Sequence, residues 1–157
     1  TRSTRSWPPD GSTSRAWPLA GDADVYLLDT NALSEILRKR PDPAFLTRLR
    51  AIPAESLHTS SICVFELRLG AALRGGRLWE RVEADVLPRV RVLPLGRDEA
   101  IRAGEVWAGL QRAGQPIGLE DVLIAATALV RDLTVVTGNV RHFDRVPGIR
   151  VANWLAG

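Results

Sequence analysis

Short apolar runs alternate with helical patterns along most of this chain, and this alternation limits its fold more than any other feature. The runs that predict strands are residues 25–28, 56–59, 90–95, 133–137 and 149–153. Between them, the spacing of apolar residues predicts helices at 31–37, 43–49, 62–73, 77–86, 97–114 and 118–132. Strands that alternate with helices predict an α/β fold, here a three-layer sandwich with a central parallel sheet.

The first 24 residues differ from the rest of the chain. They are rich in Ser, Thr, Gly and Pro and show neither helical nor alternating spacing. An imperfect repeat runs through them, because the residues RSWP at 5–8 return as RAWP at 15–18. We expect residues 1–24 to be a flexible tail, either an appendage or an upstream extension. A single domain is then expected over residues 25–157, a length sufficient for one core.

Composition narrows the class of protein. No stretch approaches the roughly eighteen apolar residues of a membrane span. The single cysteine, Cys63, excludes an internal disulfide and favours a reducing, cytoplasmic location, and its apolar neighbours predict a core position. The net charge of +3 is compatible with a polyanionic partner, and all basic residues except Lys39 are arginines, which suit phosphate. Nucleotide composition or heat adaptation would explain the arginines equally well.

A carboxylate follows the first predicted strand. The apolar residues 25–28 are followed directly by Asp29, Thr30 and Asn31. These residue types cap helices and form turns, which would explain them on structural grounds alone. Open parallel sheets also place their functional groups at the carboxyl ends of strands, and this is the alternative for Asp29.

Two further acids lie in helices that the sequence predicts to be buried. Glu66 has apolar neighbours on nearly every side of its helix, and Asp121 lies in the first turn of another apolar helix. A buried carboxylate without a partner costs several kcal/mol. Glu66 could pair with Arg68 or Arg74, and Asp121 could owe its place to the helix dipole alone.

Together the three acids favour a shared cation. Oxygen ligands select Mg²⁺, with Mn²⁺ as a substitute, and Mg²⁺ commonly takes one or two carboxylates. The chain has two histidines, which are too few and too scattered to indicate zinc. A fourth polar position, Asn139, follows the strand at 133–137. It could cap the next turn, orient water or offer its carbonyl oxygen to a cation.

Four sequence blocks taken together resemble a known family. The blocks are LLDTN at 27–31, Glu66 in its helix, EDVLIAATAL at 120–129 and VTGNVRHF at 136–143. In this order they resemble the PIN-domain ribonucleases, and most closely the VapC toxins of bacterial VapBC toxin–antitoxin systems. The resemblance covers about residues 25–154.

The resemblance implies a function and a set of site residues. It implies a Mg²⁺-dependent endoribonuclease on a PIN-like fold, in which Asp29, Glu66 and Asp121 hold the metal. Asn139 stands where the family often has Asp, so the site would have one negative charge fewer to hold a second metal ion. The RNA substrate would contact residues near the groove, for which the candidates are Asn31, Arg38, Arg40, Arg68 and Thr137. The family also implies a homodimer and a VapB-like antitoxin whose tail covers the acidic groove.

Other classes fit less well. A receiver domain needs a lysine after a late strand, but the only lysine is Lys39. A haloacid-dehalogenase-type phosphatase needs a second Asp where Asn31 stands, and no phosphate-binding loop of the P-loop type is present. The remaining alternative is a catalytically idle PIN domain that binds RNA or a partner protein.

Overall fold

The computed structural model describes residues 24–155, and its core is a five-stranded parallel sheet. The strand order is β3-β2-β1-β4-β5. The strands are β1 (Tyr26–Leu28), β2 (Leu57–Ser60), β3 (Arg91–Leu93), β4 (Thr134–Val136) and β5 (Arg150–Ala152). The predicted α/β architecture is therefore confirmed. The predicted tail, apart from Asp24, lies outside the described residues, as do residues 156–157.

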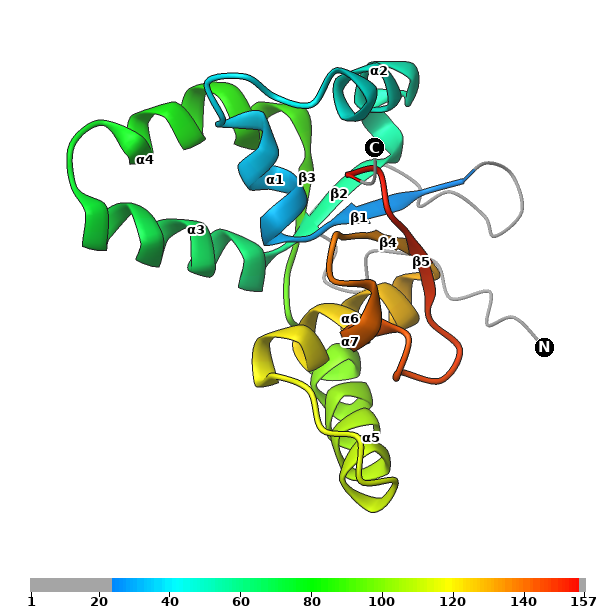
Figure 1. The fold of residues 1–157 in the computed structure, drawn as a ribbon. Coiled ribbons are helices and arrows are strands. Elements are labelled where there is room, and N and C mark those ends of the chain that lie inside the picture. Colours follow the sequence, from blue (N-terminus) through cyan, green and yellow to red (C-terminus); the bar gives the residue numbers. More distant parts are fainter. Residues whose placement is uncertain (1–23, 156–157) are drawn as a thin grey trace.

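Helices flank the sheet on both sides, with α1 to α4 on one side of the strands and α5 to α7 on the other (Figure 1). The α-helices are α1 (Thr30–Ile36), α2 (Pro43–Ala51), α3 (Ser61–Arg74), α4 (Leu78–Arg81), α5 (Arg97–Arg112), α6 (Leu119–Arg131) and α7 (Val140–Phe143). Short turns of other helix types are η1 (Ala54–Ser56), η2 (Val82–Val86) and η3 (Leu87–Arg89). Within residues 24–155, no helix has the combined length and apolarity that crossing a membrane requires.

Strand β1 lies at the centre of the sheet, between β2 and β4. Leu27 and Leu28 are fully buried, which explains why this strand lacks the alternation of a half-exposed one. Because all strands are parallel, their carboxyl ends meet at one edge of the sheet. The backbone of Asp29 extends the pairing of β1, since its N–H donates to the carbonyl of Val136 at 3.1 Å.

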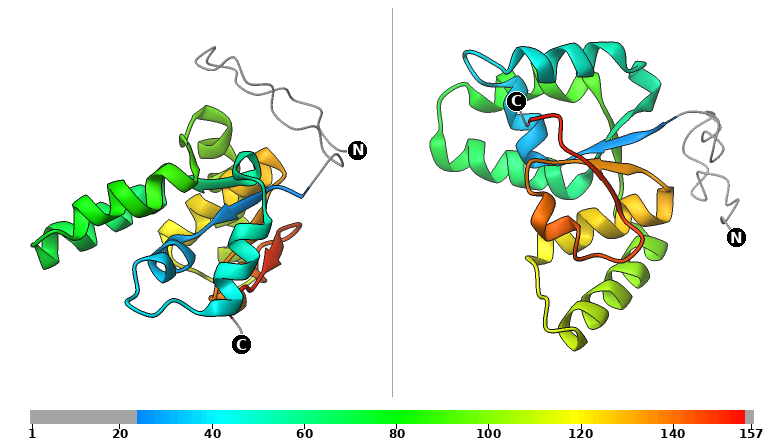
Figure 2. Two further views of the ribbon diagram at one scale, coloured as in Figure 1. Left: turned by 90° about the horizontal axis from the view of Figure 1, so that it is seen from above. Right: turned by 45° about the vertical axis from the view of Figure 1, so that its right-hand side comes forward.

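The predicted helix at 77–86 is wrong in detail. Only Leu78–Arg81 is α-helical, and the chain then widens into the π-turn η2 and tightens into the 3₁₀ turn η3. Pro88 lies in η3 and lacks the N–H that an α-helix would need at this point. Figure 2 shows that α3 and α4 form an arm that extends away from the sheet.

A buried histidine gives the fold a dependence on pH. His58 in β2 is 1% exposed, and its Nδ1 lies 3.3 Å from the carbonyl oxygen of Tyr26. Burial lowers the pKa of His58 to about 4 from an ordinary value of 6.5. Between about pH 6.5 and 4, His58 is therefore protonated in the unfolded chain but neutral in the folded one. Protonation favours the unfolded chain, so the fold loses stability as the pH falls through this range.

We predict that His58→Gln removes this acid-dependent loss. The contribution amounts to at most about 3 kcal/mol, from a pKa difference of about 2.5 units. Urea unfolding at several pH values between 7.5 and 4.5 would compare wild type with His58→Gln. Wild type should lose stability relative to His58→Gln as the pH falls. Parallel pH profiles for the two proteins would contradict the prediction.

Candidate active site

Asp29 lies at the carboxyl end of the central strand and is 4% exposed. One carboxylate oxygen, Oδ1, accepts a hydrogen bond of 2.9 Å from the backbone N–H of Ala32, so Asp29 is also the N-cap of α1. Asp29 therefore caps a helix and also lies at the strand end where a functional group was the alternative, so the two interpretations do not exclude each other. Burial, reinforced by the charges of Asp121 and Glu66, raises the pKa of Asp29 to about 6.

Thr137 supports Asp29 from the end of the neighbouring strand β4. It is fully buried, and its Oγ1 accepts a hydrogen bond of 2.8 Å from the backbone N–H of Asn139. Its hydroxyl is also hydrogen-bonded to the Asp29 carboxylate. Since the oxygen accepts from Asn139, the hydroxyl proton is available for Asp29. This geometry favours a positioning role for Thr137 over the predicted contact with a substrate.

Glu66 is only half-buried, so the prediction of a buried glutamate is wrong. The reason is that α3 packs one face on the core, through Cys63, Leu67 and Ala71, and leaves the opposite face to solvent. The Glu66 Oε1 accepts a hydrogen bond of 2.7 Å from Thr30 Oγ1, so the partner is a threonine. Burial, with Asp121 and Glu120 nearby, raises the pKa of Glu66.

Asp121 is also less buried than its apolar helix predicts. Its side chain is 25% exposed, and the buried residues of α6 begin only after it, at Val122. Its Oδ2 lies 3.1 Å from Nδ1 of His142 in α7. Asp121 therefore has a specific partner in addition to the helix N-terminus.

Asn139 occupies the N-cap position of α7, but its side chain makes no capping hydrogen bond. Instead its Nδ2 lies 2.8 Å from the same Nδ1 of His142. Of the roles that the sequence left open, capping through the side chain is thereby excluded.

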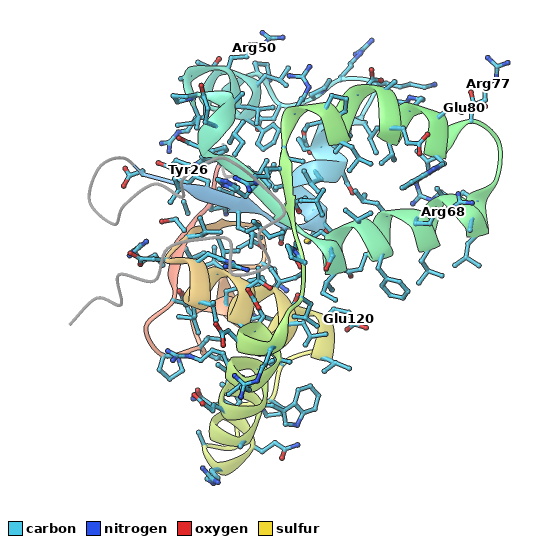
Figure 3. All side chains as sticks on the ribbon, turned by 180° about the vertical axis from the view of Figure 1, so that it is seen from behind. Tyr26, Arg50, Arg68, Arg77, Glu80 and Glu120 are labelled. Carbon is cyan, nitrogen blue, oxygen red and sulfur yellow. The ribbon has the colours of Figure 1, made fainter. Side chains whose placement is uncertain are left out.

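The remaining predicted substrate residues lie outside this cluster. Asn31 is exposed in the first turn of α1. The guanidinium carbon of Arg68 lies 5.0 Å from the centre of the Trp79 ring, so Arg68 extends from α3 toward α4 (Figure 3). Binding of RNA by these residues stays a prediction.

Sequence reasoning missed three members of the site. His142 was considered only as a zinc ligand, although it lies three residues after Asn139 in the last block. Thr30 was expected to shape the turn after β1, and its bond to Glu66 joins elements 36 residues apart. Glu120 precedes Asp121, and its charge acts on Glu66. Figure 3 shows Glu120 at the start of α6, at the rim of the molecule.

The site suits a hard divalent cation in its donor atoms and its charge. Asp29, Glu66 and Asp121 offer carboxylate oxygens, and the raised pKa values of Asp29 and Glu66 arise partly from repulsion that a cation would relieve. Within residues 24–155, however, no three His, Cys, Asp or Glu side chains converge closely enough to share one ion. Each carboxylate is held by a protein partner instead, so convergence on an ion requires side-chain rotation.

Comparison with known proteins gives one consistent match. The sequence pattern of the PIN domain matches residues 26–149. The chain is 35% identical over 131 residues to the tRNA(fMet)-specific endonuclease VapC of Salmonella typhimurium, covering 82% of this chain and 97% of that protein.

Solved structures of two relatives have the same fold. The DNA-bound VapBC of Salmonella typhimurium superposes with a TM-score of 0.75 at 36% identity, covering 84% of this chain and 99% of that one. FitAcB of Neisseria gonorrhoeae superposes with a TM-score of 0.75 at 34% identity, covering 83% and 98%.

We predict that Asp29→Asn stabilises the metal-free protein at pH 7. A carboxyl group whose pKa is about 6 when folded and 3.8 when unfolded disfavours folding by up to about 3 kcal/mol above pH 6. The amide removes that charge and can still accept from Ala32. The advantage should shrink as the pH falls from about 6 toward 3.8, because the wild-type carboxyl then becomes neutral in the folded state.

Urea unfolding in EDTA would measure this effect, with Glu105→Gln on the exposed side of α5 as the matched loss of one charge. If Asp29→Asn were less stable than wild type at pH 7, favourable interactions within the protein would outweigh the cost of burying the Asp29 charge. Net repulsion among Asp29, Glu66 and Asp121 would then be absent.

Proposed function

Because the chain belongs to the PIN-domain family, among its VapC-type toxins, we propose that it is a Mg²⁺-dependent endoribonuclease that hydrolyses RNA phosphodiesters. One observation supports this activity above the others. Three carboxylates from three separate elements, Asp29, Glu66 and Asp121, lie near enough for their charges to act on one another at one edge of the sheet. The name of the Salmonella relative, an endonuclease, agrees with it.

In this mechanism Asp29 and Asp121 would hold the cation, with Glu66 beside them directly or through water. A bound Mg²⁺ would supply charge stabilisation for the phosphate oxygens and a lowered pKa for the attacking water. Thr137 and the N–H of Ala32 fix the Asp29 carboxylate, and Thr30 fixes that of Glu66. These bonds hold the two carboxylates at the same edge of the sheet, from which a side-chain rotation would bring them onto the cation.

RNA would be held mainly through its phosphates. Arg38 and Arg40 are exposed in the segment after α1, so they can contact an RNA backbone without any change in the core. Such contacts make binding weaker as the salt concentration rises.

The proposed partners are a VapB-like antitoxin and a second copy of the chain. The two related structures described above are toxin–antitoxin assemblies, which supports an antitoxin here. For the second copy, the outer face of α3 carries an exposed apolar stripe, which consists of Phe65 (57% exposed), Leu69 (47%) and Leu73 (79%). The spacing of four residues places these side chains on one helix face, which a second copy would cover.

A catalytically idle domain that binds RNA or protein is the competing function. The observation in its favour is Asn139, a neutral residue where the family often has a carboxylate. Cleavage by the purified protein separates the two functions.

We predict that Asp29→Asn and Asp121→Asn each reduce RNA cleavage by orders of magnitude, because each removes a charge that the cation requires. Glu105→Gln, which removes an exposed charge from α5, should cleave as the wild type does. Gel assays with a structured RNA in Mg²⁺, with and without excess EDTA, would measure this. Undiminished cleavage in EDTA would refute metal dependence, and no cleavage by wild type under any divalent ion would favour the idle domain.

We predict that Leu73→Asp weakens self-association of the chain at least tenfold, since the charge would have to be buried between the two copies. Ile101→Asp is a suitable control, because Ile101 in α5 is also exposed (47%) and apolar but lies outside the stripe. Sedimentation equilibrium of the three proteins would measure the dimer constant. A wild-type monomer at high concentration, or equal weakening by both variants, would contradict this role of the stripe.

A further inference from the structure

One ring nitrogen of His142 lies within hydrogen-bond distance of two site residues. Nδ1 is 2.8 Å from Asn139 Nδ2 and 3.1 Å from Asp121 Oδ2. Asn139 follows β4, whereas Asp121 lies in the first turn of α6, so His142 joins two residues that are 18 positions apart in the sequence. His142 takes no part in the proposed hydrolysis.

The two contacts cannot both be good hydrogen bonds at the same time. If Nδ1 carries a proton, it donates to the Asp121 carboxylate but cannot accept from the amide group of Asn139. If Nδ1 is unprotonated, it accepts from Asn139 Nδ2, and its lone pair then faces the Asp121 oxygen with no proton between them. A neutral imidazole has one ring proton, so each tautomer satisfies one partner and releases the other.

The choice of partner has consequences for the carboxylate cluster. In the first arrangement, Asp121 Oδ2 is held by His142. In the second, Asp121 is released and the Asn139 amide is held through its nitrogen, which leaves its carbonyl oxygen free of this contact. The second arrangement therefore releases one oxygen donor, Oδ2 of Asp121. The carbonyl oxygen of Asn139 does not contact His142 in either arrangement, and both oxygens are of the kind that Mg²⁺ prefers.

We propose that His142 is a positioning residue that bonds to Asp121 in the metal-free protein and exchanges it for Asn139 when a divalent cation binds. This inference rests on the metal site of the proposed function. The observation behind it is the position of His142 Nδ1, which lies within hydrogen-bond distance of both Asp121 and Asn139. The exchange moves one ring proton from Nδ1 to Nε2 through solvent, so the imidazole stays neutral.

A hydrogen-bond chain makes Asn139 a suitable second partner. The Asn139 N–H donates to Thr137 Oγ1, and the Thr137 hydroxyl is bonded to Asp29. The backbone of Asn139 is therefore fixed relative to the buried carboxylate, and only its amide group is free to change partner. The chain runs from Asp29 through Thr137, Asn139 and His142 to Asp121.

Nitrogen NMR of the histidine rings would test the exchange directly. The chain contains two histidines, so ¹⁵N-histidine labelling gives two ring systems, and buried His58 provides an internal reference. The full chain would be titrated with MgCl₂ at about pH 8, above the ordinary histidine pKa of about 6.5. Two-bond ¹H–¹⁵N spectra identify which ring nitrogen carries the proton.

We expect the His142 proton to be on Nδ1 without Mg²⁺ and on Nε2 at saturating Mg²⁺, while the signals of His58 stay unchanged. Asn139→Asp should abolish the exchange, because a carboxylate cannot donate to Nδ1 and the Nδ1 proton then has an acceptor in both states. Asn153→Asp, an exposed asparagine near the carboxyl end, is the matched control and should behave as wild type.

Each other outcome overturns the proposal. An unchanged His142 tautomer in a protein whose other signals show Mg²⁺ binding refutes the exchange but leaves the endoribonuclease proposal standing. A spectrum that does not respond to Mg²⁺ at all refutes both the exchange and the metal site beneath it. An exchange that persists in Asn139→Asp shows that Asn139 is not the second partner.

Discussion

The burial of one carboxylate at the end of the central strand is the constraint on which the rest of this site depends. Asp29 extends the backbone pairing of β1 with β4 and caps α1. Its position is therefore set by the sheet and the helix together, and a shift of its carboxylate would disturb both. This double attachment keeps a charged group at 4% exposure in a surrounding that raises its pKa to about 6. The fold thus holds the Asp29 carboxylate in place, although the charge of this carboxylate lowers the stability of the fold at neutral pH.

The polar groups around Asp29 form one connected network. Thr137 bonds to Asp29 and to the backbone of Asn139, and His142 lies between Asn139 and Asp121. These residues come from three separate segments, so the geometry of the site is a property of how the elements pack. Networks of this kind act as a unit, because a change in one bond alters the donors and acceptors left for the next.

Helix α3 serves the core and the surface with opposite faces. Cys63, Leu67 and Ala71 are buried against the sheet, whereas Phe65, Leu69 and Leu73 face solvent. Glu66 lies between these faces, half-buried and bonded to Thr30. Apolar side chains occur on both faces of this helix, and sequence alone therefore predicts that the whole helix is buried. In the structure only one of these two faces packs on the core.

The sequence by itself determined the parallel α/β fold, the burial of Cys63 and the place of Asp29 at the end of a buried strand, because these follow from local spacing of apolar residues and from turn-forming residues. The π-turn after α4, the half-exposure of Glu66 and Asp121 and the contact of His142 with two site residues were decided only by the tertiary structure. These features depend on which faces of the helices meet, and on distances between residues far apart in the chain. The physical reason is that spacing records whether a side chain is apolar, whereas hydrogen bonds and exposure depend on the neighbours that packing brings to it.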